Sequence, residues 1–454
     1  MMAGIYEPLF RHALYPFYES VLRRRHTLRY LREYEASQWL SAEQVRALQW
    51  KQLKALLEFC YREVPYYAEQ WRRLGVEPDD IRTPQDFARL PLLTKDDIRT
   101  HFEQLKARPY RDTLLLKLTG GSTGDPLRFG HTRESYERRN AVMWRGYSWG
   151  GAKLGRRALY LWAGRVGGPP SRARRAKEWL YHSMFARRLL NTFSMSEANM
   201  ASFADAIDRY RPEIIVGYVG PAAQLARWML ETGRKVHRPK AFLGAAEALH
   251  GYQRAQIEQA FGCPAYNTYG CREFMLIASE CERRDGLHIN ADHLMVEIND
   301  PRPCADGSGS AGDVVITDLN NYGMPFIRYT NGDLAESVEG DCACGRGLPR
   351  LAHVRGRKLD ALRTPRGQLL PGEFFPHMLK DVPGLRQFQV VQRQLDRLDI
   401  TLVRGPGFSD AGLDYIRAEV AKVLGDSVSL RFDYADRIAK LPNGKFRVTR
   451  CELA

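Results

Sequence analysis

Residues 119–125 combine glycine with hydroxyl and carboxyl side chains in one short stretch, Thr-Gly-Gly-Ser-Thr-Gly-Asp. Glycine lets backbone N–H groups approach phosphate oxygens, and serine and threonine hydroxyls add donors, so the composition suits a triphosphate. The stretch is not a Walker loop, because no lysine follows Gly124. Taken alone, it is equally compatible with an ordinary flexible turn. The candidate phosphate-binding residues are Thr119, Gly120, Gly121, Ser122, Thr123 and Gly124.

Cysteine and histidine form two pairs that could hold a metal ion. Six residues separate Cys281 from His288, and one residue separates Cys342 from Cys344. Four soft or borderline ligands in two pairs suit a closed tetrahedral zinc site, although the spacing differs from that of a standard zinc finger. A site with no open position would be structural. Separate reduced thiols and a surface histidine are the alternative.

Length and composition exclude several classes of protein. A chain of 454 residues exceeds the capacity of one core, about 250 to 300 residues, so at least two domains are expected. The chain is 44% hydrophobic and 27% charged, which is not the composition of a disordered protein. No apolar run approaches the ~18 residues of a membrane span, and residues 1–30 lack the apolar core of a secretory signal, so we expect a cytoplasmic protein. The net charge of +15 would attract phosphates, acidic surfaces or nucleic acid.

The elements that must position these residues form an α/β pattern. Residues 41–102 read as largely helical, with Pro65 breaking the pattern and Thr94 capping a later helix. Short apolar runs then alternate with helical patterns, as in wound α/β layers. The predicted strands of this part are 157–162, 214–219, 241–244, 265–267, 295–298 and 314–318.

The last hundred residues change character. They predict strands at 388–392, 398–403 and 427–433 and a helix at 411–424, which make a compact α+β unit. We therefore predict a large domain at 1–356 and a small domain at 357–454. Within the large domain, a helical section at about 1–110 precedes an α/β core at about 111–356.

Five further stretches follow the glycine-rich loop in a fixed order. They are Gly-Ala-Ala-Glu at 244–247, Tyr-Asn-Thr-Tyr-Gly-Cys-Arg-Glu at 266–273, Tyr-Thr-Asn-Gly-Asp at 329–333, Gly-Arg-Lys at 356–358 and Leu-Pro-Asn-Gly-Lys at 441–445. Together these motifs resemble those of the adenylate-forming superfamily, which activates carboxylates as acyl-AMP. The stretches at 64–67 and 92–95 and the cysteines are most similar to the phenylacetate-CoA ligase branch and its capsular-polysaccharide-associated relatives. The resemblance runs from about residue 50 to the end.

The resemblance implies a role for each motif. Lys445, on a mobile loop, would place its charge between the carboxylate and the α-phosphate, and Arg357 would reach phosphate or ribose oxygens. Glu273 would bind magnesium, a hard cation that prefers oxygen ligands. Asp333 would accept hydrogen bonds from the ribose hydroxyls, and Tyr269 would lie against the nucleotide.

Other assignments follow from the same resemblance. The rest of the nucleotide-binding set is Ala246, Glu247 and Gly270. Trp162, Tyr218 and Gly220 are candidates to line the acyl or thiol pocket, although an aromatic residue at a strand end, such as Trp162, is more often part of the core. The resemblance also implies that the core at about 111–356 binds the nucleotide and that 357–454 is a mobile lid with a hinge near 357–361. Asp360 lies near this hinge, and Lys440 competes with Lys445 as the catalytic lysine. Relatives carry similar Cys-His and Cys-x-Cys pairs, which strengthens the zinc expectation for Cys281, His288, Cys342 and Cys344. Cys271 has no evident histidine base beside it, so a packing role is expected.

The implied function is ATP-dependent activation of a carboxylic acid as acyl-AMP, followed by transfer to an acceptor. Coenzyme A is the expected acceptor, with ATP and Mg²⁺ as cofactors and Zn²⁺ as a structural ion. An amine or hydroxyl acceptor is the near alternative. A different class of function, a zinc-stabilised basic protein that binds nucleic acid or anionic surfaces, is left open by the charge.

Overall fold

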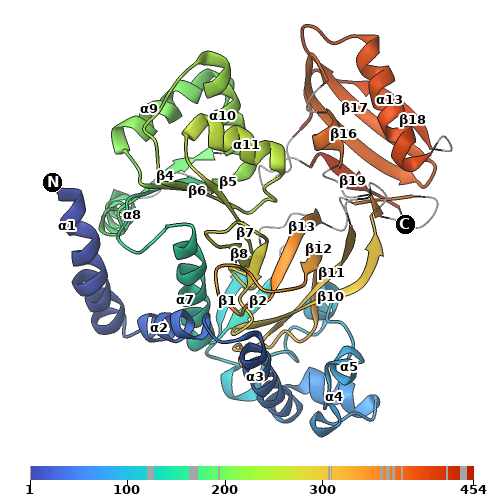
Figure 1. Cartoon of the computed structure of the whole chain (residues 1–454). Helices are drawn as coiled ribbons and strands as arrows, with labels where there is room; N and C mark the ends of the chain where they lie inside the picture. The colour runs from blue at the N-terminus through green and yellow to red at the C-terminus, as the bar shows by residue number, and fades with distance from the viewer. Residues whose placement is uncertain are drawn as a thin grey trace.

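The structure is a computed structural model. It describes residues 2–119, 127–162, 172–192, 195–304, 307, 309–357, 361–364, 369–370, 374–379, 382–425, 428–439 and 447–453. Figure 1 shows a helical N-terminal section, a large central sheet with helices on its parallel half, and a small C-terminal unit. In this described part, no helix is both long enough and apolar enough to cross a bilayer.

The N-terminal section is helical from Met2 onward, so helices also precede the stretch at 41–102 within the section predicted as helical at about 1–110. Its elements are α1 (Met2–Leu9), the π-helical turns η1 (Phe10–Leu14) and η2 (Phe17–Leu22), α2 (Thr27–Ser37), α3 (Ala42–Glu63), α4 (Pro65–Arg73), η3 (Pro78–Asp80), α5 (Pro84–Ala88), α6 (Lys95–Thr100) and η4 (Arg108–Tyr110). Pro65 is the first residue of α4, where its missing N–H costs nothing. The predicted cap at Thr94 is confirmed, because its side chain accepts a hydrogen bond from the Asp97 backbone N–H at 3.2 Å.

A two-stranded hairpin and an eleven-stranded sheet make the centre of the molecule. The hairpin is β1 (Leu115–Leu118) with β2 (Arg128–His131). The sheet has the strand order β10-β11-β12-β13-β9-β8-β7-β6-β5-β3-β4. Its parallel half consists of β3 (Ala158–Trp162), β4 (Arg187–Asn191), β5 (Ile214–Tyr218), β6 (Ala241–Ala245) and β7 (Ala265–Tyr269). The helices of this region are α7 (Arg133–Trp149), α8 (Arg172–Met184), η6 (Glu197–Asn199), α9 (Met200–Tyr210), α10 (Val219–Thr232) and α11 (Gly251–Phe261).

The antiparallel half continues the same sheet. Its strands are β8 (Ala278–Glu280), β9 (Leu287–Ile289), β10 (Leu294–Pro303), β11 (Ser310–Asp318), β12 (Tyr329–Val338) and β13 (Arg350–Arg357). The predicted strands at 295–298 and 314–318 are the apolar parts of β10 and β11, which both extend further. β12 and β13 have no apolar run long enough to predict them from sequence.

The C-terminal unit has its own sheet and core. Its elements are β14 (Leu362–Arg363), β15 (Leu369–Leu370), α12 (Phe374–Leu379), β16 (Leu385–Gln394), β17 (Arg397–Arg404), α13 (Asp410–Leu424), β18 (Ser429–Tyr434) and β19 (Thr449–Cys451). A four-stranded sheet in the order β18-β17-β16-β19 packs with α12 and α13 around one hydrophobic cluster that runs from Leu362 to Cys451. The α+β unit predicted for this region is thus present, whereas the exact boundary near 357–361 stays a prediction because 358–360 lie outside the described residues.

Candidate active site

Residues from three predicted motifs meet where the parallel half of the sheet joins the antiparallel half. Tyr269 ends β7, Glu273 lies in the loop that follows, Asp333 lies within β12, and Arg357 ends β13. β12 and β13 are antiparallel, and their register places Asp333 opposite Arg357. Asp333 follows Asn331-Gly332, a pair typical of surface turns, but the residue is inside a strand and only 6% exposed.

Three donors fix the carboxylate of Asp333. The Tyr269 hydroxyl donates to its Oδ2 at 2.8 Å, the Asn331 side-chain amide donates to the same oxygen at 2.7 Å, and Arg357 Nε lies 3.0 Å from Oδ1. Burial raises the pKa of Asp333, although the neighbouring Arg357 guanidinium opposes this shift. The charge of Asp333 in turn raises the pKa of Arg357. The pair is therefore pre-aligned, with a buried carboxylate beside a guanidinium whose side chain is 40% exposed.

A tight loop brings Glu273 to the same place. A Cβ atom on Gly270 would lie 1.9 Å from the carbonyl oxygen of Met275, so only glycine fits at this position. Glu273 is 7% exposed, and its Oε1 accepts a hydrogen bond from the Tyr329 hydroxyl at 3.0 Å. Because Tyr329 begins β12, this bond ties the loop after β7 to the strand that carries Asp333.

Lys95 joins this group, and we assigned it no role from the sequence. Leu93 forms an isolated parallel bridge with Tyr329 at the start of β12, because Leu93 N–H donates to Arg328 O at 2.9 Å and Thr330 N–H donates to Leu93 O at 3.0 Å. A Cβ atom on Gly332 would lie 3.9 Å from both Lys95 Nζ and Arg357 Nη1. Burial lowers the pKa of Lys95, and Arg357 lowers it further, while Glu273 and Asp333 oppose the shift.

A sequence signal for Lys95 did exist. It is the first residue of α6, and a cation at a helix N-terminus opposes the helix dipole. A residue that departs from such a local preference without an evident gain in stability often has a functional role. The two cations Lys95 and Arg357 therefore lie beside the two carboxylates, an arrangement suited to holding a polyphosphate and its counter-ion.

The hairpin that carries the glycine-rich loop is connected to the Glu273 loop. His131, at the end of β2, contacts the Arg139 guanidinium, and Arg139 Nη2 donates to the carbonyl oxygen of Arg272 at 2.6 Å. At the base of the loop, the Thr119 hydroxyl accepts from Leu127 N–H at 2.8 Å. The other predicted loop residues, Gly120, Gly121, Ser122, Thr123 and Gly124, lie outside the described residues, as do Lys440, Lys445 and Asp360.

The predicted pocket residues lie at the carboxyl ends of neighbouring parallel strands. Trp162 ends β3 and Tyr218 ends β5, and their rings have centroids 4.6 Å apart. Gly220 N–H donates to Glu247 Oε2 at 2.6 Å, and Ala246 adopts a left-handed conformation with φ of 66°. Since Tyr269 ends β7 on the same edge, these residues and the charged group share the edge at which open α/β sheets bind ligands.

The side chain of Glu247 has a structural contact that the sequence did not predict. Its bond to Gly220 N–H satisfies one of the free donors at the start of α10. Cys271, set aside as a nucleophile from the sequence, is buried enough that its pKa rises well above the usual value for a thiol. A thiol in this state is a poor nucleophile, which agrees with the packing role expected for it.

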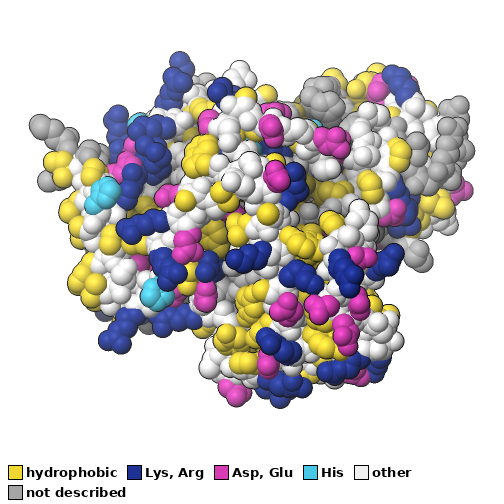
Figure 2. Space-filling view, turned by 60° about the horizontal axis from the view of Figure 1, so that its bottom comes forward, with side chains coloured by type: hydrophobic (Ala, Val, Ile, Leu, Met, Phe, Trp, Pro, Cys, Tyr) yellow, Lys and Arg dark blue, Asp and Glu magenta, His cyan; other side chains and the backbone are white. Residues whose placement is uncertain are grey.

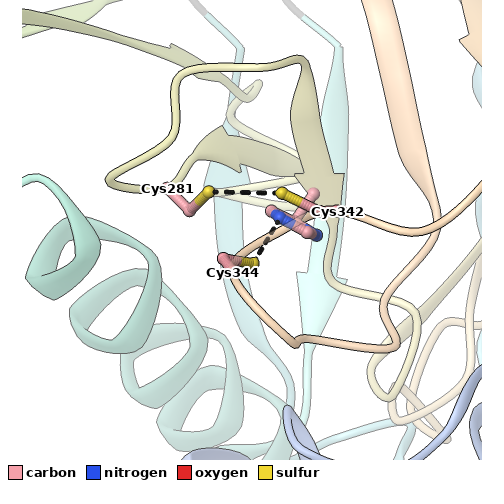
Figure 3. A group of neighbouring side chains, drawn as sticks. Cys281, Cys342 and Cys344 are labelled. Carbon is pink, nitrogen blue, oxygen red and sulfur yellow. Dashed lines mark hydrogen bonds between the residues drawn. The ribbon is translucent and has the colours of Figure 1, made fainter.

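The four predicted metal ligands converge in space. Figure 3 shows Cys281 and Cys342 facing each other, with Cys344 directed at a neighbouring ring nitrogen. The donor atoms of Cys281, His288, Cys342 and Cys344 all lie within 4.8 Å of one another. Cys281 Sγ and Cys342 Sγ are 3.8 Å apart, and Cys344 Sγ is 3.3 Å from His288 Nε2. Two sulfurs on one tetrahedral zinc ion, each about 2.3 Å from the metal, would be separated by about 3.8 Å, so the spacing fits such an ion.

The surroundings of these ligands fit a metal as well. His288 Nδ1 lies 3.1 Å from the carbonyl oxygen of Leu348, which holds the proton on Nδ1 and leaves Nε2 to face the cluster. Burial lowers the pKa of His288 to about 4 and raises the pKa of Cys281 to about 12. Burial would also raise the pKa of Cys344, but hydrogen bonds from Arg346 outweigh it and lower that pKa. The histidine is therefore neutral, as a metal ligand must be.

Comparison with known proteins identifies chains that are similar to this one. Residues 362–452 match the family model of the CapK C-terminal domain. The phenylacetate-coenzyme A ligase of Thermus thermophilus is 28% identical over 405 residues, which cover 84% of this chain and 87% of that protein. Protein CapK of Staphylococcus aureus is 21% identical over 434 residues, which cover 94% of this chain and 93% of that protein.

Solved structures share the fold. A crystal structure of 2-hydroxyisobutyryl-CoA ligase in the postadenylation state, in complex with R3-HIB-AMP, superposes with a TM-score of 0.69 at 20% identity. The match covers 90% of this chain and 89% of that one. The resemblance expected from the sequence motifs is thus confirmed: the chain is similar over most of its length to phenylacetate-coenzyme A ligases and to protein CapK, and it has the α/β fold of the adenylate-forming ligases.

Proposed function

We propose that this protein is an AMP-forming ligase that activates a carboxylic acid and transfers it to coenzyme A. In the first step a carboxylate oxygen attacks the α-phosphorus of ATP, and the bond to pyrophosphate breaks. In the second step the thiol of coenzyme A, losing its proton, attacks the acyl carbonyl and AMP leaves. The observation that carries the proposal is the convergence of Tyr269, Glu273, Asp333 and Arg357 with the additional cation Lys95.

The contacts within this group support a division of labour. Asp333 is held by three donors and would accept the ribose hydroxyls, with Tyr269 beside the nucleotide. Arg357 and Lys95 would bind phosphate oxygens and stabilise the charge that develops as pyrophosphate leaves. These cations act by position and charge, without forming covalent bonds to the substrate.

A magnesium ion fits the chemistry of Glu273. Its carboxylate is a hard oxygen ligand, and it lies within interaction range of Lys95 and Arg357, the cations that would hold the triphosphate. When bound, the ion would neutralise phosphate charge. Tyr329 orients the carboxylate for that purpose through the 3.0 Å hydrogen bond to Oε1.

The remaining assignments extend the proposal. Lys445, on the C-terminal unit, would close over the nucleotide during adenylation, with 357–454 acting as a lid. Trp162, Tyr218 and Gly220 would line the acyl or thiol pocket. Zinc bound by the Cys281 cluster would clamp the segment after Glu273 to the loop after β12, and we place the enzyme in the cytoplasm.

Coenzyme A is preferred as acceptor on the names of relatives. Four relatives, among them those of Thermus thermophilus and Escherichia coli, are named phenylacetate-coenzyme A ligases, and one structure with the same fold contains 2-HIB-AMP and CoA. An amine or hydroxyl acceptor is the alternative, since protein CapK covers even more of the chain and its name specifies no acceptor.

Pyrophosphate release over a panel of carboxylic acids tests the first step. We expect release that depends on ATP, Mg²⁺ and one class of acid, with hydroxylamine trapping the acyl-AMP. Glu273→Gln should slow release strongly, whereas Glu33→Gln, an exposed carboxylate on α2, should not. Adding coenzyme A then identifies the acceptor by thioester formation. Release that is indifferent to every acid tested would refute adenylation.

A further inference from the structure

The elements α1, η1 and η2 (Met2–Leu22) form one helical segment, which we call the N-terminal helix. It carries apolar side chains on two opposite faces. Its inner face is covered: Phe10 and Tyr15 are 0% and 2% exposed, and both pack against Phe185. Its outer face carries exposed apolar residues at every fourth position, namely Ile5, Leu9, Ala13, Phe17 and Val21. In a regular α-helix, residues four apart drift around the axis. Here they stay on one face, because the helix includes π-helical turns, which contain more residues per turn than α-helical ones.

Helix α8 lies beside this N-terminal helix and adds to the exposed apolar surface. The Tyr6 hydroxyl donates to the carbonyl oxygen of Met184 at 2.5 Å, at the end of α8. On α8, Trp179 is 71% exposed and Leu180 is 63% exposed. Exposed tryptophan and leucine on adjoining helices are more than scattered surface apolar residues and mark an interaction site. We call Ile5, Leu9, Phe17, Val21, Trp179 and Leu180 the outer apolar surface.

The segments that carry the outer apolar surface are rich in basic residues. Residues 2–32 contain six arginines against two glutamates, and α8 contains four basic residues against one glutamate. Both glutamates of the first segment are already engaged, Glu7 with Arg11 and Glu19 with Arg25. Figure 2 shows yellow and dark blue side chains side by side along the left edge, where this helix lies in Figure 1.

We propose that the N-terminal helix and α8 dock the protein on the surface of an anionic lipid bilayer. Apolar side chains that enter the interface beside lysine and arginine that meet anionic headgroups are the pattern of interfacial helices. A second copy of this chain would bring two basic surfaces together, and nucleic acid would leave Trp179 and Leu180 in water. This inference does not depend on the proposed catalytic function.

Vesicle sedimentation of the full chain tests the docking. Wild-type protein should sediment with vesicles of phosphatidylcholine mixed with phosphatidylglycerol, bind pure phosphatidylcholine more weakly, and be released by salt. Leu9→Gln, Phe17→Gln and Trp179→Gln should each weaken binding about tenfold, because each removes a large apolar side chain from the interface. Since all three residues are exposed, the variants should keep the wild-type melting temperature.

Control variants test whether vesicle binding is specific to the outer apolar surface or reflects nonspecific binding by exposed apolar residues. Leu74→Gln and Leu395→Gln change residues that are 51% and 47% exposed in other elements, and they should bind vesicles like wild type. Arg23→Gln should reduce binding to anionic vesicles about fivefold and leave binding to neutral vesicles unchanged. Equal binding by all variants, or no binding by wild type, would overturn the proposal. A wild-type dimer in vesicle-free sedimentation that Phe17→Gln dissociates would also overturn it, by assigning the surface to a second copy.

Discussion

Replacing Asp333 by asparagine tests the proposed nucleotide site most directly. Oδ2 accepts hydrogen bonds from Tyr269 and Asn331, and Oδ1 faces Arg357 Nε. An amide has only one oxygen, so in either orientation its NH₂ group meets at least one of these donors. Asp333→Asn also removes the negative charge that a ribose hydroxyl would meet.

The size of the effect follows from that change. A hydrogen bond to a charged group contributes about 1.5–3 kcal/mol, so AMP should bind about 10- to 150-fold more weakly to Asp333→Asn. Titration calorimetry with AMP measures this. Asp300→Asn is the matched control, because Asp300 is an exposed carboxylate on β10 that pairs with Arg302.

The dependence on pH provides a second test of the same residue. Burial raises the pKa of Asp333, so AMP affinity of the wild type should fall as the pH drops, beginning above the usual carboxyl pKa of about 3.9. Asp333→Asn should lack that decline. An AMP affinity within twofold of wild type in a folded variant would refute the assignment of Asp333 to the nucleotide.

Three further perturbations address other parts of the structure. Lys95→Ala should raise the KM for ATP, and Lys95→Arg should retain ATP binding at alkaline pH, where the wild type loses it early because burial lowers the pKa of Lys95. Cys281→Ser should lose bound zinc and melt at lower temperature, whereas Cys451→Ser, at a half-buried cysteine outside the cluster, should keep zinc. Arg145→Met should cost about 3–5 kcal/mol in urea unfolding, because it leaves the buried Asp292 carboxylate without the cation that lies 2.5 Å away.

Each of these expectations has an outcome that contradicts it. An unchanged KM for ATP in Lys95→Ala would remove Lys95 from the phosphate site. Purified wild type without zinc, under conditions that retain the metal in zinc proteins, would favour separate thiols. A loss below about 1 kcal/mol for Arg145→Met, similar to that of an exposed ion pair, would mean that the charges are not desolvated as described.

The parts of the fold that could be predicted are those in which residue types alone determine the structure. Apolar runs predicted the cores of β5, β6 and β11, and the Thr94 cap predicted the start of α6. β12 could not be predicted, because Asn331-Gly332-Asp333 reads as a turn. In the structure β12 pairs with β11 and β13, and these tertiary contacts outweigh the turn propensity.

The candidate site was predictable only where motifs named its residues. Glu273, Asp333 and Arg357 came from motif resemblance, and the structure brings them together. The position of Lys95 at a helix N-terminus was a signal of function, but its place in this site depended on the bridge between Leu93 and Tyr329, which are far apart in the chain and carry no signal of contact in one sequence. The link from His131 through Arg139 to the Glu273 loop depended on burial, which sequence patterns do not give for charged residues.

The N-terminal helices and the antiparallel strands share one hydrophobic cluster, in which Leu53 and Trp71 pack with residues such as Ile316 and Leu351. Cutting the chain near residue 110 would therefore divide this cluster between two fragments and expose it on both. Neither fragment is then expected to fold alone, and the two should be recovered as active protein only when they are co-expressed. Replacing the helical section by another would also require changes in the strands that pack against it. We therefore expect Lys95, which lies in the helical section, and Asp333, which lies on β12, to be retained together.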